Sequence, residues 1–226
     1  DVILTLSDSV TSRLGRLGVP ATTPSVTLFH PDLRYVERPA MLSLRADAPI
    51  KLLFLGRILH YKGLPLFLDA AQRLRDEGLA IEVGVFGEGD TSACTAQLQA
   101  LDVELVNRWL TNAEIADALG RYHAVVLSHT SASQSGVVAT AHGAGLPVVV
   151  TPVGGLLEQV EHGVTGLIAE RADVSALTDS MRELCAPARY RELLRGVAAS
   201  RTARSMPRFI RACVAAASGV DIRGEQ

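Results

Sequence analysis

From residue 50 onward, short apolar runs of strand length alternate with segments whose apolar residues recur at helical spacing. Residues 50–55, 81–86 and 124–127 are strand candidates, and residues 64–75 form a helical segment between the first two. A run such as 124–127, with no polar alternation, indicates a strand that is buried on both faces. Strands joined through helices at this spacing predict an α/β fold, a Rossmann-like parallel sheet with helices on both faces.

Composition narrows the class of protein. The chain has 226 residues, is 48% hydrophobic and carries a net charge of −2, which is typical of a globular protein of one or two domains. No apolar run reaches the roughly 18 residues of a membrane span, and the acidic balance gives no support for nucleic-acid binding. Three widely spaced cysteines, Cys94, Cys185 and Cys213, argue against a disulfide framework and a zinc site. We therefore expect a cytoplasmic protein.

The chain also divides into segments. It opens at Asp1 with a strand-like run and no initiator methionine or leader, which suggests an excerpt from a longer protein. Three prolines and little periodicity mark a linker. The expected organisation is a lead-in segment or tail of a preceding domain at 1–30, a linker at 31–49, a Rossmann-like domain at 50–185 and C-terminal helices at 186–226.

One turn has the composition of an anion site. Ser133, Gln134, Ser135 and Gly136 come directly before a helical run, so their backbone N–H groups are expected to point out of a helix N-terminus. The helix macrodipole favours an anion there. The plainer alternative is that a serine-rich turn before a helix is only an N-cap.

Two cations support the anion-site reading. Arg57 and Lys62 lie in the loop that leaves the apolar strand ending at Leu55. In an open α/β sheet the loops at the carboxyl ends of the strands line the ligand crevice. Two cations and a helix N-terminus at that edge predict a diphosphate clamp.

The order of motifs resembles a known family. G-R-I-L-H-Y-K-G at 56–63, V-G-V-F-G-E-G-D at 83–90, N-R-W-L-T-N-A-E-I at 107–115, S-A-S-Q-S-G at 131–136 and V-G-G-L-L-E at 153–158 are similar to the C-terminal, nucleotide-sugar-binding domain of family-4 glycosyltransferases, the donor half of the GT-B two-domain fold. The resemblance covers about residues 50–185, and residues 2–29 resemble the end of the preceding acceptor domain. It implies transfer of a hexose from a nucleoside diphosphate sugar, with retention, to an acceptor such as a glycan or lipid-linked saccharide.

The resemblance also implies residue roles. Arg57 and Lys62 match the basic pair that holds the donor diphosphate and stabilises the leaving charge, which a metal ion does elsewhere. No metal and no cofactor besides the donor substrate are therefore expected, and this fragment without its acceptor domain is expected to be inactive. The donor-binding positions that the resemblance implies are Gly56, Gly87, Asn107, Trp109, Leu110, Gln134, Ser135, Gly136, Thr140, Gly154, Gly155 and Glu158.

One departure from the family pattern leaves alternatives open. Ala132 and Thr140 stand where the family usually has two glutamates, the first near the sugar and the second on the ribose. A nucleotide-sugar epimerase of similar fold and a non-catalytic nucleotide-sugar-binding or scaffold module are the alternative functions. Glu158 either reaches the sugar or caps a loop, and His142 either packs or contacts ligand.

Arginines are frequent near the C-terminus. They either form a solvated face paired with Glu183 and Glu192, or contact the missing N-terminal domain or anionic lipid at the inner membrane face. The residues concerned are Arg189, Arg191, Arg195, Arg201, Arg204, Arg208 and Arg211.

Overall fold

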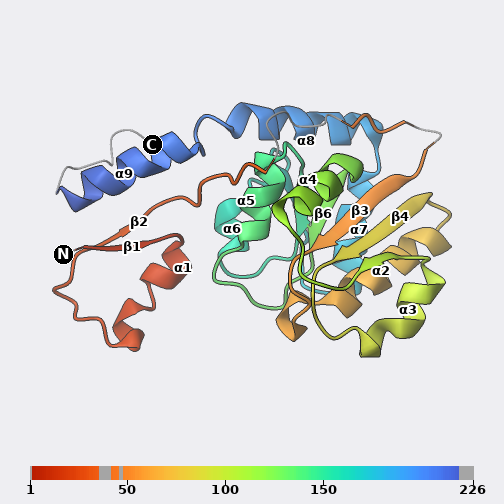
Figure 1. Ribbon diagram of the computed structural model, residues 1–226, viewed down its shortest axis with the longest axis horizontal. Coiled ribbons are helices and arrows are strands. Elements are labelled where there is room, and N and C mark those ends of the chain that lie inside the picture. Colours follow the sequence, from red (N-terminus) through yellow and green to blue (C-terminus); the bar gives the residue numbers. More distant parts are fainter. Residues whose placement is uncertain (1, 36–41, 46–47, 219–226) are drawn as a thin grey trace.

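The computed structural model, which describes residues 2–35, 42–45 and 48–218, is built around a six-stranded parallel sheet (Figure 1). The strand order is β5-β4-β3-β6-β7-β8. The strands are β3 (Ile50–Leu55), β4 (Ile81–Phe86), β5 (Glu104–Val106), β6 (Ala124–Leu127), β7 (Val148–Val150) and β8 (Gly166–Ile168). The predicted Rossmann-like α/β class is confirmed.

Helices cover both faces of this sheet, because alternate strand residues point to opposite sides. Leu52 and Phe54 of β3 join one core cluster, with α2, α3, α7 and α8, whereas Leu53 and Leu55 join the other, with α4, α5 and α6. The helices are α2 (Leu64–Asp76), α3 (Thr95–Ala100), α4 (Asn112–Arg121), α5 (Gly136–Gly143), α6 (Leu156–Gln159), α7 (Val174–Leu184) and α8 (Pro187–Ser200).

The chain reverses direction across the sheet between β3 and β6. It runs outward from β3 through β4 to β5, then returns so that β6 pairs with β3, with Leu53 opposite Val125. The carboxyl ends of β3 and β6 therefore adjoin at a topological switch point. In open α/β sheets the ligand crevice lies at such a point.

A smaller unit lies at one end of the molecule. It consists of a two-stranded parallel sheet, β1 (Ile3–Thr5) with β2 (Ser25–Thr27), the short helix α1 (Asp8–Thr11), the 3-10 turn η1 (Leu14–Leu17) and the last helix, α9 (Met206–Ala217) (Figure 1). Phe29, just after β2, packs edge-on against Phe209 of α9, with 5.8 Å between ring centroids. The first and last parts of the described chain thus meet in one place.

The connections between these elements have local structure of their own. A 3-10 turn, η3 (Ser92–Cys94), precedes α3. The predicted linker 31–49 is partly packed, since Leu44 joins the core and Asp32 is buried, while its residues 36–41 and 46–47 lie outside the described residues. In the described ranges no helix is both long and apolar enough to cross a bilayer.

Candidate functional site

The switch point brings the predicted basic loop against the start of α5. Gly56 has φ +101°, and a Cβ built on it would lie 3.6 Å from Nζ of Lys62 and 3.3 Å from Cγ2 of Val137 in the first turn of α5. The Lys62 ammonium therefore reaches back to the end of β3 and toward the helix N-terminus. The two halves of the predicted clamp therefore adjoin, while binding of a diphosphate between them stays a prediction.

The charges at this edge disfavour one another. Burial, and secondly the positive charge of Arg57, lowers the pKa of Lys62. Arg57 itself is exposed beside the same loop. A diphosphate bound between the two cations would raise the pKa of Lys62 again and so offset the effect of Arg57, because a nearby anion favours the charged form of the amine.

The loop that carries Lys62 is held by the residues that follow β6. Ser128 donates from Oγ to the carbonyl oxygens of Lys62, at 3.1 Å, and Gly63, at 2.8 Å. The Thr130 N–H donates to the Tyr61 carbonyl at 2.7 Å. Lys62 is the last residue of the 3-10 turn η2 (His60–Lys62). Because these bonds fix the backbone of this turn, they also fix where the side chain of Lys62 begins.

His129 was not among the predicted site residues. Its side chain is only 4% exposed, its ring packs edge-on against Tyr61 at 5.9 Å, and Nδ1 has no hydrogen-bond partner among the described residues. Burial, and secondly the charge of Lys62, lowers its pKa to about 4, so the imidazole is neutral at pH 7. Its position two residues after the buried strand β6 was the signal in the sequence that could have placed His129 at this edge of the sheet.

The turn before α5 is an N-cap, as the plainer alternative expected. Ser135 Oγ accepts the N–H of Val137 at 3.3 Å, while the Ser135 N–H donates to Oε1 of Gln159 at 2.7 Å. The Ser135 N–H is therefore already paired, which narrows the predicted anion site toward the N–H of Gly136, the first residue of α5. Gln134 Oε1 is buried and lacks a hydrogen-bond partner within the described ranges.

The glycine pair 154–155 lies against this turn. A Cβ on Gly154, which has φ +48°, would lie 1.8 Å from the Ala132 carbonyl oxygen, and one on Gly155 would lie 1.9 Å from that of Ser133. Close approach of two protein loops therefore requires glycine at both positions. Contact of either glycine with a ligand stays a prediction.

The loops predicted to lie near a base also pack on one another. Gly87 has φ +142°, and a Cβ there would lie 2.1 Å from the Gly56 carbonyl oxygen. The Asn107 amide binds both backbone groups of Gly89, accepting its N–H at 3.0 Å and donating to its carbonyl at 2.9 Å. Trp109 is 70% exposed and Leu110 half-buried, so the indole face is accessible.

The remaining predicted positions lie deeper or face elsewhere. Thr140 is 6% exposed within α5. The Glu158 carboxylate accepts the N–H groups of Asp8, at 2.6 Å, and Ser9, at 3.0 Å, which is the capping alternative rather than a reach toward a sugar. His142 packs, with Nε2 3.0 Å from the Thr165 carbonyl oxygen.

The C-terminal arginines do not share one surface. Arg189 pairs with Glu183 at 2.7 Å and Glu192 at 3.2 Å, as the solvated-face alternative expected. Arg204 is instead largely buried beside Asp32. Contact of this region with anionic lipid stays a prediction.

The sequence model of the family described as "Glycosyl transferases group 1" matches residues 49–186, which is more than half of the chain. This range includes the loop of Arg57 and Lys62, the turn before α5 and the glycine pair 154–155. The chain belongs to this family. The group 1 match begins one residue before the predicted Rossmann-like domain and ends one residue after it.

Curated relatives are glycosyltransferases of several kinds. The amylovoran biosynthesis glycosyltransferase AmsK of Erwinia amylovora is 26% identical over 197 residues, covering 78% of this chain and 46% of AmsK. A D-inositol 3-phosphate glycosyltransferase of Paenarthrobacter aurescens is 29% identical over 195 residues, covering 83% of this chain and 47% of that protein. The chain thus spans about half the length of the curated relatives it matches.

Solved structures share the fold. HepE from Anabaena, solved in complex with UDP-glucose, aligns with a TM-score of 0.79 at 15% identity, covering 97% of this chain and 64% of that one. Sucrose-phosphate synthase from Thermosynechococcus elongatus aligns with a TM-score of 0.74 at 21% identity, covering 96% and 59%. This group 1 chain therefore has the fold of GT-B glycosyltransferases.

Proposed function

We propose that this chain is the donor-binding part of a retaining hexosyltransferase, which moves a hexose from a nucleoside diphosphate sugar to a glycan or lipid-linked acceptor. Family membership supports glycosyl transfer. The UDP and UDP-glucose complexes of HepE support a nucleoside diphosphate as the ligand class. A preceding acceptor domain, cytoplasmic placement and contact with the inner membrane face belong to the same proposal.

The observation that carries the proposal is the position of Lys62. Its ammonium lies at the switch point, beside Arg57 and the first turn of α5. Two cations and a helix N-terminus together offset the two charges of a diphosphate and the charge that develops as the glycosidic bond breaks. No metal is required in this arrangement, which makes metal independence part of the proposal.

The clamp is tested by removing each cation. Arg57→Ala and Lys62→Ala should each weaken UDP binding at least about tenfold, because a charge-assisted contact contributes roughly 1.5 to 3 kcal/mol. Calorimetry at constant salt measures the dissociation constants. Lys51→Ala is the matched control, since Lys51 is the chain's other lysine and pairs with Glu82 near the start of β3. Unchanged affinity in both clamp variants would overturn the proposed site.

Activity is tested on the 226-residue chain and on a longer protein that contains it. The chain alone should bind the donor in the presence of EDTA and transfer no sugar, because it spans about half the length of its relatives. Donor binding is measured by thermal shift with UDP, ADP and GDP and their sugars. Loss of binding on chelation would refute metal independence. Binding without transfer by the longer protein would favour the non-catalytic module that Ala132 and Thr140 suggest.

A further inference from the structure

The side chain of Gln159 is hydrogen-bonded to the turn that precedes α5. Its Oε1 accepts the Ser135 N–H at 2.7 Å, and its Nε2 donates to the Ser135 carbonyl at 3.0 Å. One amide thus binds both backbone groups of the residue that caps the helix. The two residues are 24 apart in sequence, so this contact fixes the relative position of two loops rather than closing a local turn.

Ser135 occupies a critical place in the proposed donor site. Its Oγ caps α5, and the next residue, Gly136, offers the first helical N–H. Val137, one residue further, is the neighbour of the Gly56 and Lys62 pair. A displacement of Ser135 would move the helix N-terminus away from the ammonium, and electrostatic binding of one anion by both groups requires that they converge.

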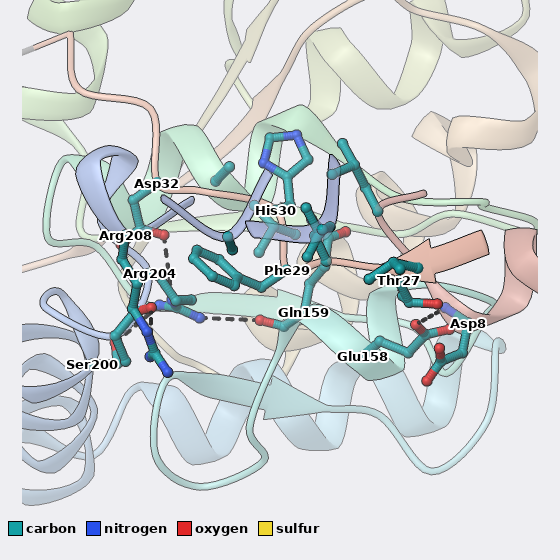
Figure 2. A pocket seen from close by; sticks show the side chains of 18 of the residues that line it. Asp8, Thr27, Phe29, His30, Asp32, Glu158, Gln159, Ser200, Arg204 and Arg208 are labelled. Carbon is teal, nitrogen blue, oxygen red and sulfur yellow. Dashed lines mark hydrogen bonds and ion pairs between the residues drawn. The ribbon is translucent and has the colours of Figure 1, made fainter. Parts of the chain in front are cut away.

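The main chain of Gln159 is in turn bound by Arg204. Arg204 donates to the Gln159 carbonyl at 3.2 Å and to Oγ of Ser200 at 3.0 Å, and its Nε lies 3.3 Å from Oδ1 of Asp32 (Figure 2). Arg204 and Asp32 also share a backbone bond, since the Asp32 N–H donates to the Arg204 carbonyl at 2.9 Å. These contacts place Arg204 between the segment that follows β2 and the end of α6.

From this geometry we infer that Gln159 is a positioning residue for the donor diphosphate, which holds Ser135 so that the Gly136 N–H and the Lys62 ammonium face the same anion. The inference rests on the proposed function. Gln159 touches neither the sugar nor the phosphates in this scheme. Gln159 acts only through the backbone of Ser135. Arg204, in turn, fixes the main chain of Gln159.

The test replaces Gln159 by methionine, which keeps the length of the side chain and removes both hydrogen bonds. Gln159→Met should weaken UDP binding about tenfold, because both hydrogen bonds that hold the Ser135 backbone beside the anion are lost. Binding of uridine, which lacks the phosphates, should change less than about twofold. Gln97→Met is the matched control, since the Gln97 amide donates to the exposed carboxylate of Asp69 on the helix α2, away from the α5 turn. Calorimetry measures the dissociation constants of UDP and uridine for wild type, Gln159→Met and Gln97→Met.

A second measurement does not depend on the ligand. Amide hydrogen exchange of the free protein should accelerate at residues 133–137 in Gln159→Met and stay unchanged there in Gln97→Met. Equal UDP affinity in wild type and Gln159→Met, or equal loss for UDP and uridine, would overturn the positioning role. If the wild-type protein fails to bind UDP, the proposed function fails as stated for UDP. Unchanged exchange at 133–137 in Gln159→Met would refute the claim that the Gln159 amide holds the Ser135 backbone.

Discussion

Replacing Gly63 by alanine should destabilise the protein by about 3 kcal/mol or more and abolish UDP binding. Gly63 has φ +67°, a conformation that costs a residue with a side chain roughly 1 to 2 kcal/mol. Its added Cβ would also lie 2.0 Å from the Ser128 carbonyl oxygen, which belongs to backbone at the end of the buried strand β6. Relief requires the loop that carries Lys62 to move away from that strand.

The two costs can be separated with a control. Gly78 has φ +85° but no atom within 4 Å of its added Cβ, so Gly78→Ala has the conformational cost without the clash. Urea unfolding of both variants measures the difference. If Gly63→Ala costs no more than Gly78→Ala and still binds UDP, then contact between the basic loop and β6 does not determine the geometry of the clamp.

Acidification from pH 7 to pH 5 should remove about 2.5 kcal/mol of stability. Burial lowers the pKa of His142 to about 3 and that of His129 to about 4, so both stay neutral in the folded protein where the unfolded chain takes up protons. Such groups contribute stability above the unfolded value of 6.5, and it is lost as the pH falls toward the folded value. Each imidazole loses roughly 1.9 kcal/mol between pH 7 and pH 5, because the unfolded imidazole takes up most of its proton only below pH 6.5.

Asp32 acts in the opposite direction. Burial, against the charges of Arg204, Arg201 and Arg34, raises its pKa to about 6. A raised pKa contributes stability below the unfolded value that is lost as pH rises through the folded value, so acidification from pH 7 to pH 5 restores about 1.3 kcal/mol. Subtracting this gain from the roughly 4 kcal/mol lost by the two histidines gives the net figure.

Urea unfolding at pH 7 and pH 5 measures the effect. His142→Gln should be less stable at pH 7, because the bond to Thr165 is lost, yet show a smaller loss on acidification. Equal slopes in wild type and His142→Gln would mean that burial of His142 does not govern the acid response.

The sheet was predictable because its signals are local. β3 and β4 have the bounds that their apolar runs indicated, and β6 has the predicted bounds 124–127. The proximity of Lys62 to the start of α5 followed from a general rule about carboxyl ends of parallel strands. Neither result required knowledge of side-chain partners.

The contacts that complete the site were not predictable in this way. Gln159 and Ser135 are 24 residues apart, and Glu158 meets Asp8 across 150 residues. An amide or a carboxylate has no sequence pattern that names its partner, so Glu158 was expected at the donor as readily as at a cap. The glycine pair 154–155 was expected at the donor, and the group that approaches it closely is the turn 132–134, while its contact with a ligand stays a prediction.

The polypeptide passes twice between the sheet domain and the end unit of β1, β2, α1 and α9, once after β2 and once between α8 and α9 (Figure 1). Asp32 and Arg204 join these two passages to one another. Two connections that are joined to one another restrict rotation of the end unit relative to the sheet domain more than a single connection would. Arg204, at their junction, also donates to the main-chain carbonyl of Gln159, so the point where the connections meet contacts the residue that holds the Ser135 backbone.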